Sequence, residues 1–170
     1  MKREANSLLT DTHTHICDAA FDADRAGVLA RAEQSGIRAI IAVGEDLADG
    51  QKNLVLAREF PILKPAAGLY PTHLDLAAAE EMMAFIRARQ AELCAVGEVG
   101  LDFWVVKSEK ERVLQKEIFA RFIALAIELD LPLNVHSRSA GRHAVDLLVA
   151  NGAKRVQLHA FDGKITAARP

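Results

Sequence analysis

The sequence predicts an α/β fold, an incomplete TIM-type (β/α) barrel with about six of the eight parallel βα units of that fold. Two observations lead to this prediction. Short runs that are apolar at nearly every position alternate with longer segments of helical periodicity, and this alternation is typical of βα units around a parallel sheet. The 170 residues, 51% of them hydrophobic, suit one domain over 1–170 and are too few for two.

Six strands are expected, because each run is short and apolar on both of its faces, as in strands buried within a parallel sheet. They lie at residues 8–11, 39–43, 61–69, 93–97, 131–135 and 156–158. No G-x-G-x-x-G turn follows the first strand, and no G-K-[ST] phosphate loop is present. The sequence therefore argues against a dinucleotide-binding or P-loop fold.

Five helices are expected in the intervening segments. The first begins after a cap at Asp22 or Asp24 and ends near Gly36. The fourth begins at a capping box formed by Ser108 and Glu111, and apolar residues follow it at helical spacing. The expected ranges of the other helices are 51–60, 76–91 and 140–150.

The charge, the cysteines and the length of the apolar segments indicate which partners and which cellular location to expect. A net charge of −2 argues against a broad basic surface for nucleic acid, although local contacts stay open. Cys17 and Cys94 form no C-x-x-C pair and are interpreted as reduced thiols. No segment has the apolar length of a signal peptide or a membrane span. We expect a cytoplasmic protein without a membrane partner or an obligate protein partner.

The first candidate motif is D-T-H-T-H, from Asp11 to His15. Residues two apart on a strand point to the same side, so Asp11, His13 and His15 should project together. Two imidazoles on one face can bind one metal ion, and the Asp11 carboxylate can hold their outer N–H groups. The alternative is a polar strand end with incidental histidines.

The second candidate motif contains two acidic residues, Glu98 and Asp102. Glu98 directly follows an apolar strand, where a carboxylate is costly to bury unless a cation neutralises it. Gly97 and Gly100 on either side permit close approach of a ligand. Glu98 is expected to bind one metal or bridge two, and Asp102 to orient a ligand or a water. The alternative for Glu98 is an exposed loop carboxylate.

Two further histidines, His136 and His159, end the fifth and sixth expected strands. Arg138 follows His136, and its planar guanidinium suits phosphate binding, with an ordinary surface cation or a salt-bridge partner as the alternative.

His73 lies in the loop after the third strand and is expected to line the substrate cleft. His143 lies within a helical segment and is expected at the surface.

The combined pattern indicates a site for two metal ions. Imidazole and carboxylate ligands without cysteine suit Zn²⁺, Mg²⁺ or Mn²⁺. Two such ions about 4 Å apart would generate hydroxide from a bridging water and stabilise the attacking and leaving oxygens. This chemistry fits hydrolysis of a phosphodiester, or of an activated ester or amide. The expected metal ligands are His13, His15, Glu98, His136 and His159.

These motifs together resemble the TatD family of metal-dependent deoxyribonucleases, within the amidohydrolase superfamily. The matching segments are D-T-H-T-H from residue 11, G-E-V-G-L-D from 97, H-S-R-S-A-G-R from 136 and H-A-F-D-G from 159. The last two look most like the TatD-domain-containing-3 branch. Tyr70 stands where the G-x-H-P loop of the family usually has its histidine.

The resemblance implies a role for each of these residues. His13 and His15 would bind one metal ion, His136 and His159 the second, and Glu98 would bridge both. Arg138 would face the scissile phosphate, which makes Glu98 and Arg138 the expected catalytic residues. The implied activity is 3′-to-5′ exonuclease action on DNA, and some relatives also act on RNA.

The chain departs from the family in one respect. The last metal-site residue of the family is an aspartate in an E-T-D-x-P motif on a later strand, and this motif is not in the sequence. We therefore expect the final βα units to be absent and the open barrel to fold poorly or self-associate. Two other functions stay open, a non-catalytic metal-binding fragment and an amidohydrolase acting on an amide or ester bond.

Overall fold

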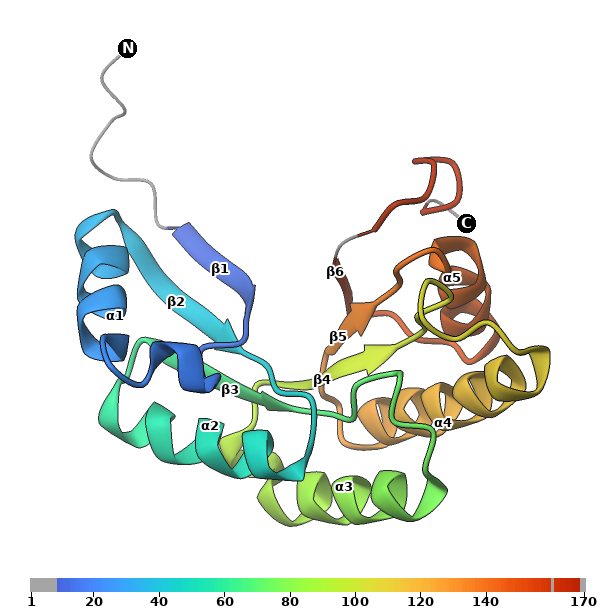
Figure 1. The fold of residues 1–170 in the computed structure, drawn as a ribbon, viewed down its shortest axis with the longest axis horizontal. Coiled ribbons are helices and arrows are strands. Elements are labelled where there is room, and N and C mark those ends of the chain that lie inside the picture. The colour runs from blue at the N-terminus through green and yellow to red at the C-terminus, as the bar shows by residue number, and fades with distance from the viewer. Residues whose placement is uncertain (1–8, 160, 169–170) are drawn as a thin grey trace.

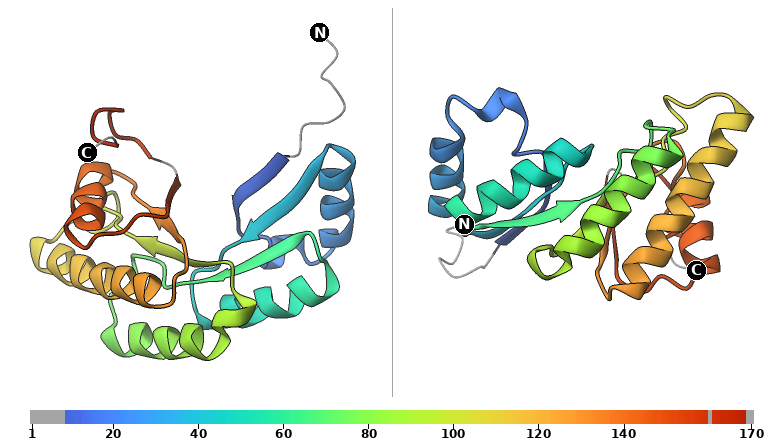
Figure 2. Two further views of the ribbon diagram at one scale, coloured as in Figure 1. Left: turned by 180° about the vertical axis from the view of Figure 1, so that it is seen from behind. Right: turned by 90° about the horizontal axis from the view of Figure 1, so that it is seen from below.

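The computed structural model describes residues 9–159 and 161–168. Six strands form one sheet in the order β1-β2-β3-β4-β5-β6, and each neighbouring pair is parallel. The sheet curves into an arc with the helices along its outer side (Figure 1). Figure 2 shows the same arrangement from behind and from below. The prediction of an incomplete (β/α) barrel is confirmed.

All six predicted strands are present. They are β1 (Leu9–Thr14), β2 (Ile37–Ala42), β3 (Leu63–Ala67), β4 (Ala95–Gly100), β5 (Leu133–His136) and β6 (Val156–His159). The first predicted strand begins at Leu8, which lies outside the described residues, as does Ala160 of the H-A-F-D-G motif.

The prediction that Glu98 follows its strand is wrong, because Glu98 lies inside β4. Parallel pairing with β5 continues beyond Glu98, with Val99 opposite Val135 and Gly100 opposite His136. The register shifts between Val96 and Val99, so the pairing is irregular around Glu98, but the strand does not end there.

The helices alternate with the strands as expected. They are α1 (Arg25–Gln34), α2 (Leu47–Glu59), α3 (Leu76–Arg89), α4 (Glu109–Glu128) and α5 (Gly141–Ala150), with short 3₁₀ turns η1 (Ala19–Phe21) and η2 (Gln90–Glu92). Helix α2 begins four residues earlier than predicted, since Asp46 caps it by accepting a hydrogen bond from the Asp49 N–H. Ser108 caps α4 through the Glu111 N–H, as predicted.

The larger core lies between the sheet and the outer helices. Phe119, Phe122 and Ile123 of α4 are fully buried there. Leu133 and Val135 of β5 belong to the same core. Because successive strand residues point to opposite faces, the residues that alternate with them, Asn134 and His136, face the concave side. This is the side on which polar side chains meet.

Two further sequence predictions are addressed by the fold. Cys17 is buried and Cys94 half-buried, and both are free thiols. Among the helices in the described ranges, none has the length and apolar character needed to cross a bilayer.

Candidate metal centre

The five predicted ligands meet at the carboxyl ends of the strands. Four of them lie on β1, β4, β5 and β6, and His15 directly follows β1. They form two groups that share Glu98, and in each group the ligand atoms lie within 4.8 Å of one another. The groups are His13, His15 and Glu98, and Glu98, His136 and His159. Catalytic residues of (β/α) barrels occupy this end of the strands.

The first group is a convergence of two imidazoles on one carboxylate oxygen. The Nε2 atoms of His13 and His15 lie 3.3 Å apart. Oε2 of Glu98 lies 3.7 Å from the first and 3.1 Å from the second. The three atoms therefore face a common point, as ligands of one ion do.

The second group uses the other oxygen of the same carboxylate. Oε1 of Glu98 lies 2.8 Å from Nδ1 of His136. His159 approaches from β6, and its ring stacks on that of His13 with centroids 3.5 Å apart. The two end strands of the sheet thus meet through side chains.

Glu98 provides the test of whether this cluster fits a metal. The residue is only 1% exposed, and among the described residues its Oε2 makes no hydrogen bond of good geometry. A buried carboxylate oxygen without such a partner is costly. Divalent ions held by imidazole and carboxylate would remove this cost, so the residues present fit metal ions.

The electrostatics of the cluster favour the ligand form at Glu98, His13 and His159. Burial opposes ionisation of Glu98, yet the imidazoles of His136 and His15 outweigh it and lower its pKa to about 2. Burial lowers the pKa of His13 and of His159, so neutral imidazole is favoured at both. The contact with Glu98 instead raises the pKa of His15. An ionised carboxylate and neutral imidazoles are the forms that bind cations.

Asp102 and Arg138 form a pair beside His136. The Asp102 carboxylate is fully buried, and its Oδ2 lies 3.1 Å from Nε2 of His136 and 3.0 Å from the Arg138 guanidinium. Burial opposes ionisation of Asp102, but the Val105 N–H, Arg138 and His136 together lower its pKa. Arg138 remains 44% exposed, so its side chain combines an ion pair with access to solvent.

The structure corrects the role predicted for Asp11. The Asp11 carboxylate accepts hydrogen bonds from the His13 backbone N–H (3.1 Å) and the Thr14 hydroxyl (2.8 Å). The outer ring nitrogen of His13 is bonded instead to Asn134, at 2.8 Å. The Asp11 carboxylate does not reach the imidazole because it folds back on its own strand. The register of β1 shifts between Asp11 and Thr14, in the same segment.

Two residues of the loop after β3, His73 and Tyr70, lie differently with respect to the cluster. His73 is exposed in the loop before α3 and lines a separate hollow with Leu47 and Asp75, so its role in substrate binding stays a prediction. Tyr70, in the same loop, places its ring 5.1 Å from that of His136. Burial, with Glu98 and Asp102 nearby, raises the Tyr70 pKa to about 12. His143 is exposed on α5, as predicted.

Asn134 and Tyr70 are site residues that the sequence prediction missed. The one signal for Asn134 was that it is a polar residue within an apolar strand. A polar group inside a buried strand needs a hydrogen-bond partner, so this signal could have identified it. For Tyr70 the signal was its position in the loop after β3, because loops at this end of a (β/α) barrel carry functional residues.

Two glycines allow β4 to lie close to β5 at the site. A side chain at Gly97 would place its Cβ 2.6 Å from Cβ of Asn134. Gly100 has φ of 144°, and a Cβ there would lie 2.1 Å from the carbonyl oxygen of His136. Only glycine fits at Gly100 without displacing the backbone.

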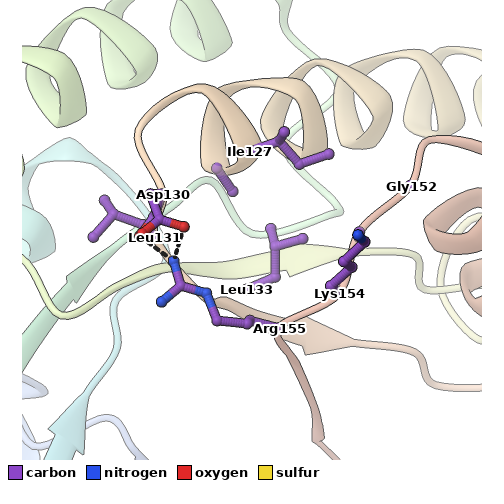
Figure 3. Close-up of a pocket in the computed structure, with 9 residues that line it drawn as sticks. Ile127, Asp130, Leu131, Leu133, Gly152, Lys154 and Arg155 are labelled. Atoms are coloured by element: carbon purple, nitrogen blue, oxygen red, sulfur yellow. Dashed lines mark hydrogen bonds and ion pairs between the residues drawn. The ribbon is translucent and has the colours of Figure 1, made fainter.

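A pocket also lies at the opposite end of the strands (Figure 3). It is lined by the end of α4 and the segments that precede β5 and β6, with Arg155 paired to Asp130. Its lining contains no histidine or cysteine. The five candidate ligands lie instead at the carboxyl ends of the strands.

Comparison with known proteins gives concordant matches. The family model described as "TatD related DNase" matches residues 10–170. The human protein "Deoxyribonuclease TATDN3" is 34% identical over 178 residues, covering 98% of this chain and 65% of that protein. The Bacillus subtilis protein "Uncharacterized metal-dependent hydrolase YabD" is 34% identical over 167 residues, covering 95% of this chain and 64% of that protein.

A solved structure shows the same architecture. The Escherichia coli TatD homolog YJJV superposes with a TM-score of 0.83 at 29% identity. The match covers 94% of this chain and 62% of that one. The chain thus spans less than two thirds of the length of each of these three proteins.

Proposed function

Because the chain belongs to the family of TatD-related DNases, we propose that it is a metal-dependent nuclease that cleaves phosphodiester bonds of DNA, or of RNA, with a metal-activated water. The observation that carries this proposal is the pair of three-residue groups that share the buried Glu98. A single carboxylate between two sets of imidazoles is an arrangement suited to two neighbouring cations.

The proposed ligands follow from the contacts. His13 and His15 would hold one divalent ion, His136 and His159 would hold the other, and Glu98 would be shared by both. When bound there, ions of Zn²⁺, Mg²⁺ or Mn²⁺ type would supply an acidified water and would stabilise charge on the attacking and leaving oxygens. The buried Asp102 keeps His136 in place through the 3.1 Å contact to its Nε2.

Arg138 is proposed to contact the scissile phosphate. Asp102 engages one side of its guanidinium through Nε and Nη2. A guanidinium offers five donors, so other N–H groups stay free for phosphate oxygens. The 44% exposure of the side chain supports this role, because a substrate can reach it. The 3′-to-5′ direction of digestion is proposed from the family resemblance.

The test is release of nucleotides from single-stranded DNA, followed with Mg²⁺, Mn²⁺ and Zn²⁺ in turn. We expect metal-stimulated release by the protein and its loss in His136→Ala. His143→Ala is the matched control, because it removes an exposed histidine outside the cluster and should leave release unchanged. Circular dichroism of each variant verifies that the fold is retained.

The negative outcomes separate the competing functions. If no metal supports cleavage of DNA or RNA, the nuclease proposal fails. Stoichiometric metal binding without hydrolysis of any phosphodiester would then favour a metal-binding protein. Hydrolysis of an amide or ester substrate instead would favour an amidohydrolase of different specificity.

A further inference from the structure

We propose that Asn134 is a positioning residue that sets the tautomer of His13 and thereby directs the Nε2 lone pair of that ring toward Glu98. The link to metal binding rests on the proposed function. The tautomer itself is a property of the metal-free protein, so it can be tested separately.

The orientation of the Asn134 amide is determined by its two partners. Its Nδ2 donates to the backbone carbonyl of Thr12 at 2.7 Å, and its Oδ1 lies 2.8 Å from Nδ1 of His13. A carbonyl oxygen can only accept, so the NH₂ group must face Thr12. The amide oxygen therefore faces His13.

The tautomer of His13 follows from this orientation. An amide oxygen can only accept a hydrogen bond, so Nδ1 of His13 must carry the proton. In a neutral imidazole the other nitrogen is then unprotonated. That nitrogen, Nε2, lies 3.7 Å from Oε2 of Glu98 and 3.3 Å from Nε2 of His15. The opposite tautomer would set two lone pairs against each other at 2.8 Å.

The surroundings hold this arrangement in place. Asn134 is 3% exposed and the His13 side chain 7% exposed, so water has little access to replace the bond. Asn134 lies on β5 and its two partners on β1, so the amide bridges strands that do not pair directly in the described sheet. The missing side chain at Gly97 leaves the space that Asn134 occupies.

The direct test is a long-range ¹H–¹⁵N correlation spectrum of the metal-free chain with EDTA at pH 8, with His13 assigned by comparison with His13→Gln. We expect the chemical shift of a protonated nitrogen at Nδ1 of His13 and that of an unprotonated nitrogen at Nε2. A protonated Nε2 with an unprotonated Nδ1 in the wild-type protein would overturn the proposal, whatever the nuclease assay shows.

Three variants extend the test. Asn134→Leu removes the acceptor, so we expect the proton to appear at Nε2 of His13. Asn134→Asp loses the donor to the Thr12 carbonyl but keeps an acceptor for Nδ1, so the proton should stay at Nδ1 of His13. Gln157→Leu is the control, because Gln157 bonds the Thr12 hydroxyl at 3.5 Å but not His13. An unchanged His13 tautomer in a folded Asn134→Leu protein would also overturn the proposal.

Metal affinity provides the second readout. Titration calorimetry with Zn²⁺ should show affinity reduced about 10- to 100-fold in Asn134→Leu, the range usual for residues that orient metal-binding histidines. Asn134→Asp and Gln157→Leu should stay near the wild-type value. Equal affinity in all four folded proteins would refute the link to metal binding. Should Asn134→Leu fail to fold, the wild-type spectrum still decides the tautomer, and the same titration of Asn134→Ala, which also lacks the acceptor, decides the link to metal binding.

Discussion

Replacement of Glu98 by glutamine removes the charge around which the histidines converge while keeping the shape of the side chain. In the metal-free protein the Glu98 pKa falls from its ordinary 4.5 to about 2. A fall of that size corresponds to about 3 kcal/mol of folding free energy. Because Glu98 is 1% exposed, solvent screens little of it. Glu98→Gln should therefore lower the free energy of unfolding at pH 7 by up to about 3 kcal/mol.

The sign of the pH dependence follows from the direction of the shift. A folded-state pKa below the unfolded-state value means that the stabilisation is present above about pH 4.5 and is lost as the pH falls toward 2. At pH 3.5 about 2 kcal/mol of it should remain. The difference between wild type and Glu98→Gln should shrink accordingly.

The assay is urea unfolding in EDTA, followed by circular dichroism at pH 7 and pH 3.5. Glu33→Gln, which neutralises an exposed glutamate on α1, controls for the change in net charge and should cost within about 0.5 kcal/mol of zero. The reasoning is refuted if the two variants are equally stable at pH 7. It is also refuted if the cost of Glu98→Gln is the same at both pH values.

Two further predictions concern the scaffold of the site. Gly100→Ala should lower the free energy of unfolding by more than about 3 kcal/mol, because its Cβ would collide with the His136 carbonyl. Gly152→Ala, at φ of 74° and with no atom of the described residues other than its chain neighbours within 4 Å of its Cβ, should cost only about 1–2 kcal/mol. Equal costs in urea unfolding would contradict the close approach of β4 and β5. We also expect the isolated 170-residue chain to self-associate, since among the described residues β1 pairs only with β2 and β6 only with β5. A concentration-independent monomer in light scattering after size-exclusion chromatography would argue against this.

The fold and the convergence of four histidines on Glu98 could be predicted because both depend on local patterns. Buried parallel strands are continuous apolar runs, and helices show their caps and periodicity. Histidines directly after such runs must lie at the carboxyl edge of a parallel sheet, so their convergence follows from topology. The ends of the strands were less predictable. Pairing with β5 extends β4 through Glu98, and the burial of this charged residue is stabilised by the neighbouring imidazoles.

The sequence by itself determined the class of fold, the order of the strands and which histidines and carboxylate converge at the strand ends, since each of these is encoded in residue type and spacing. Only the tertiary structure decided which partner each polar group meets. Asp11 lies two residues from His13, yet the ring is held by Asn134, 121 residues away. The stacking of His13 on His159 likewise joins the first strand to the sixth. Such contacts depend on how far the sheet curves, and strand curvature arises from packing across the whole sheet.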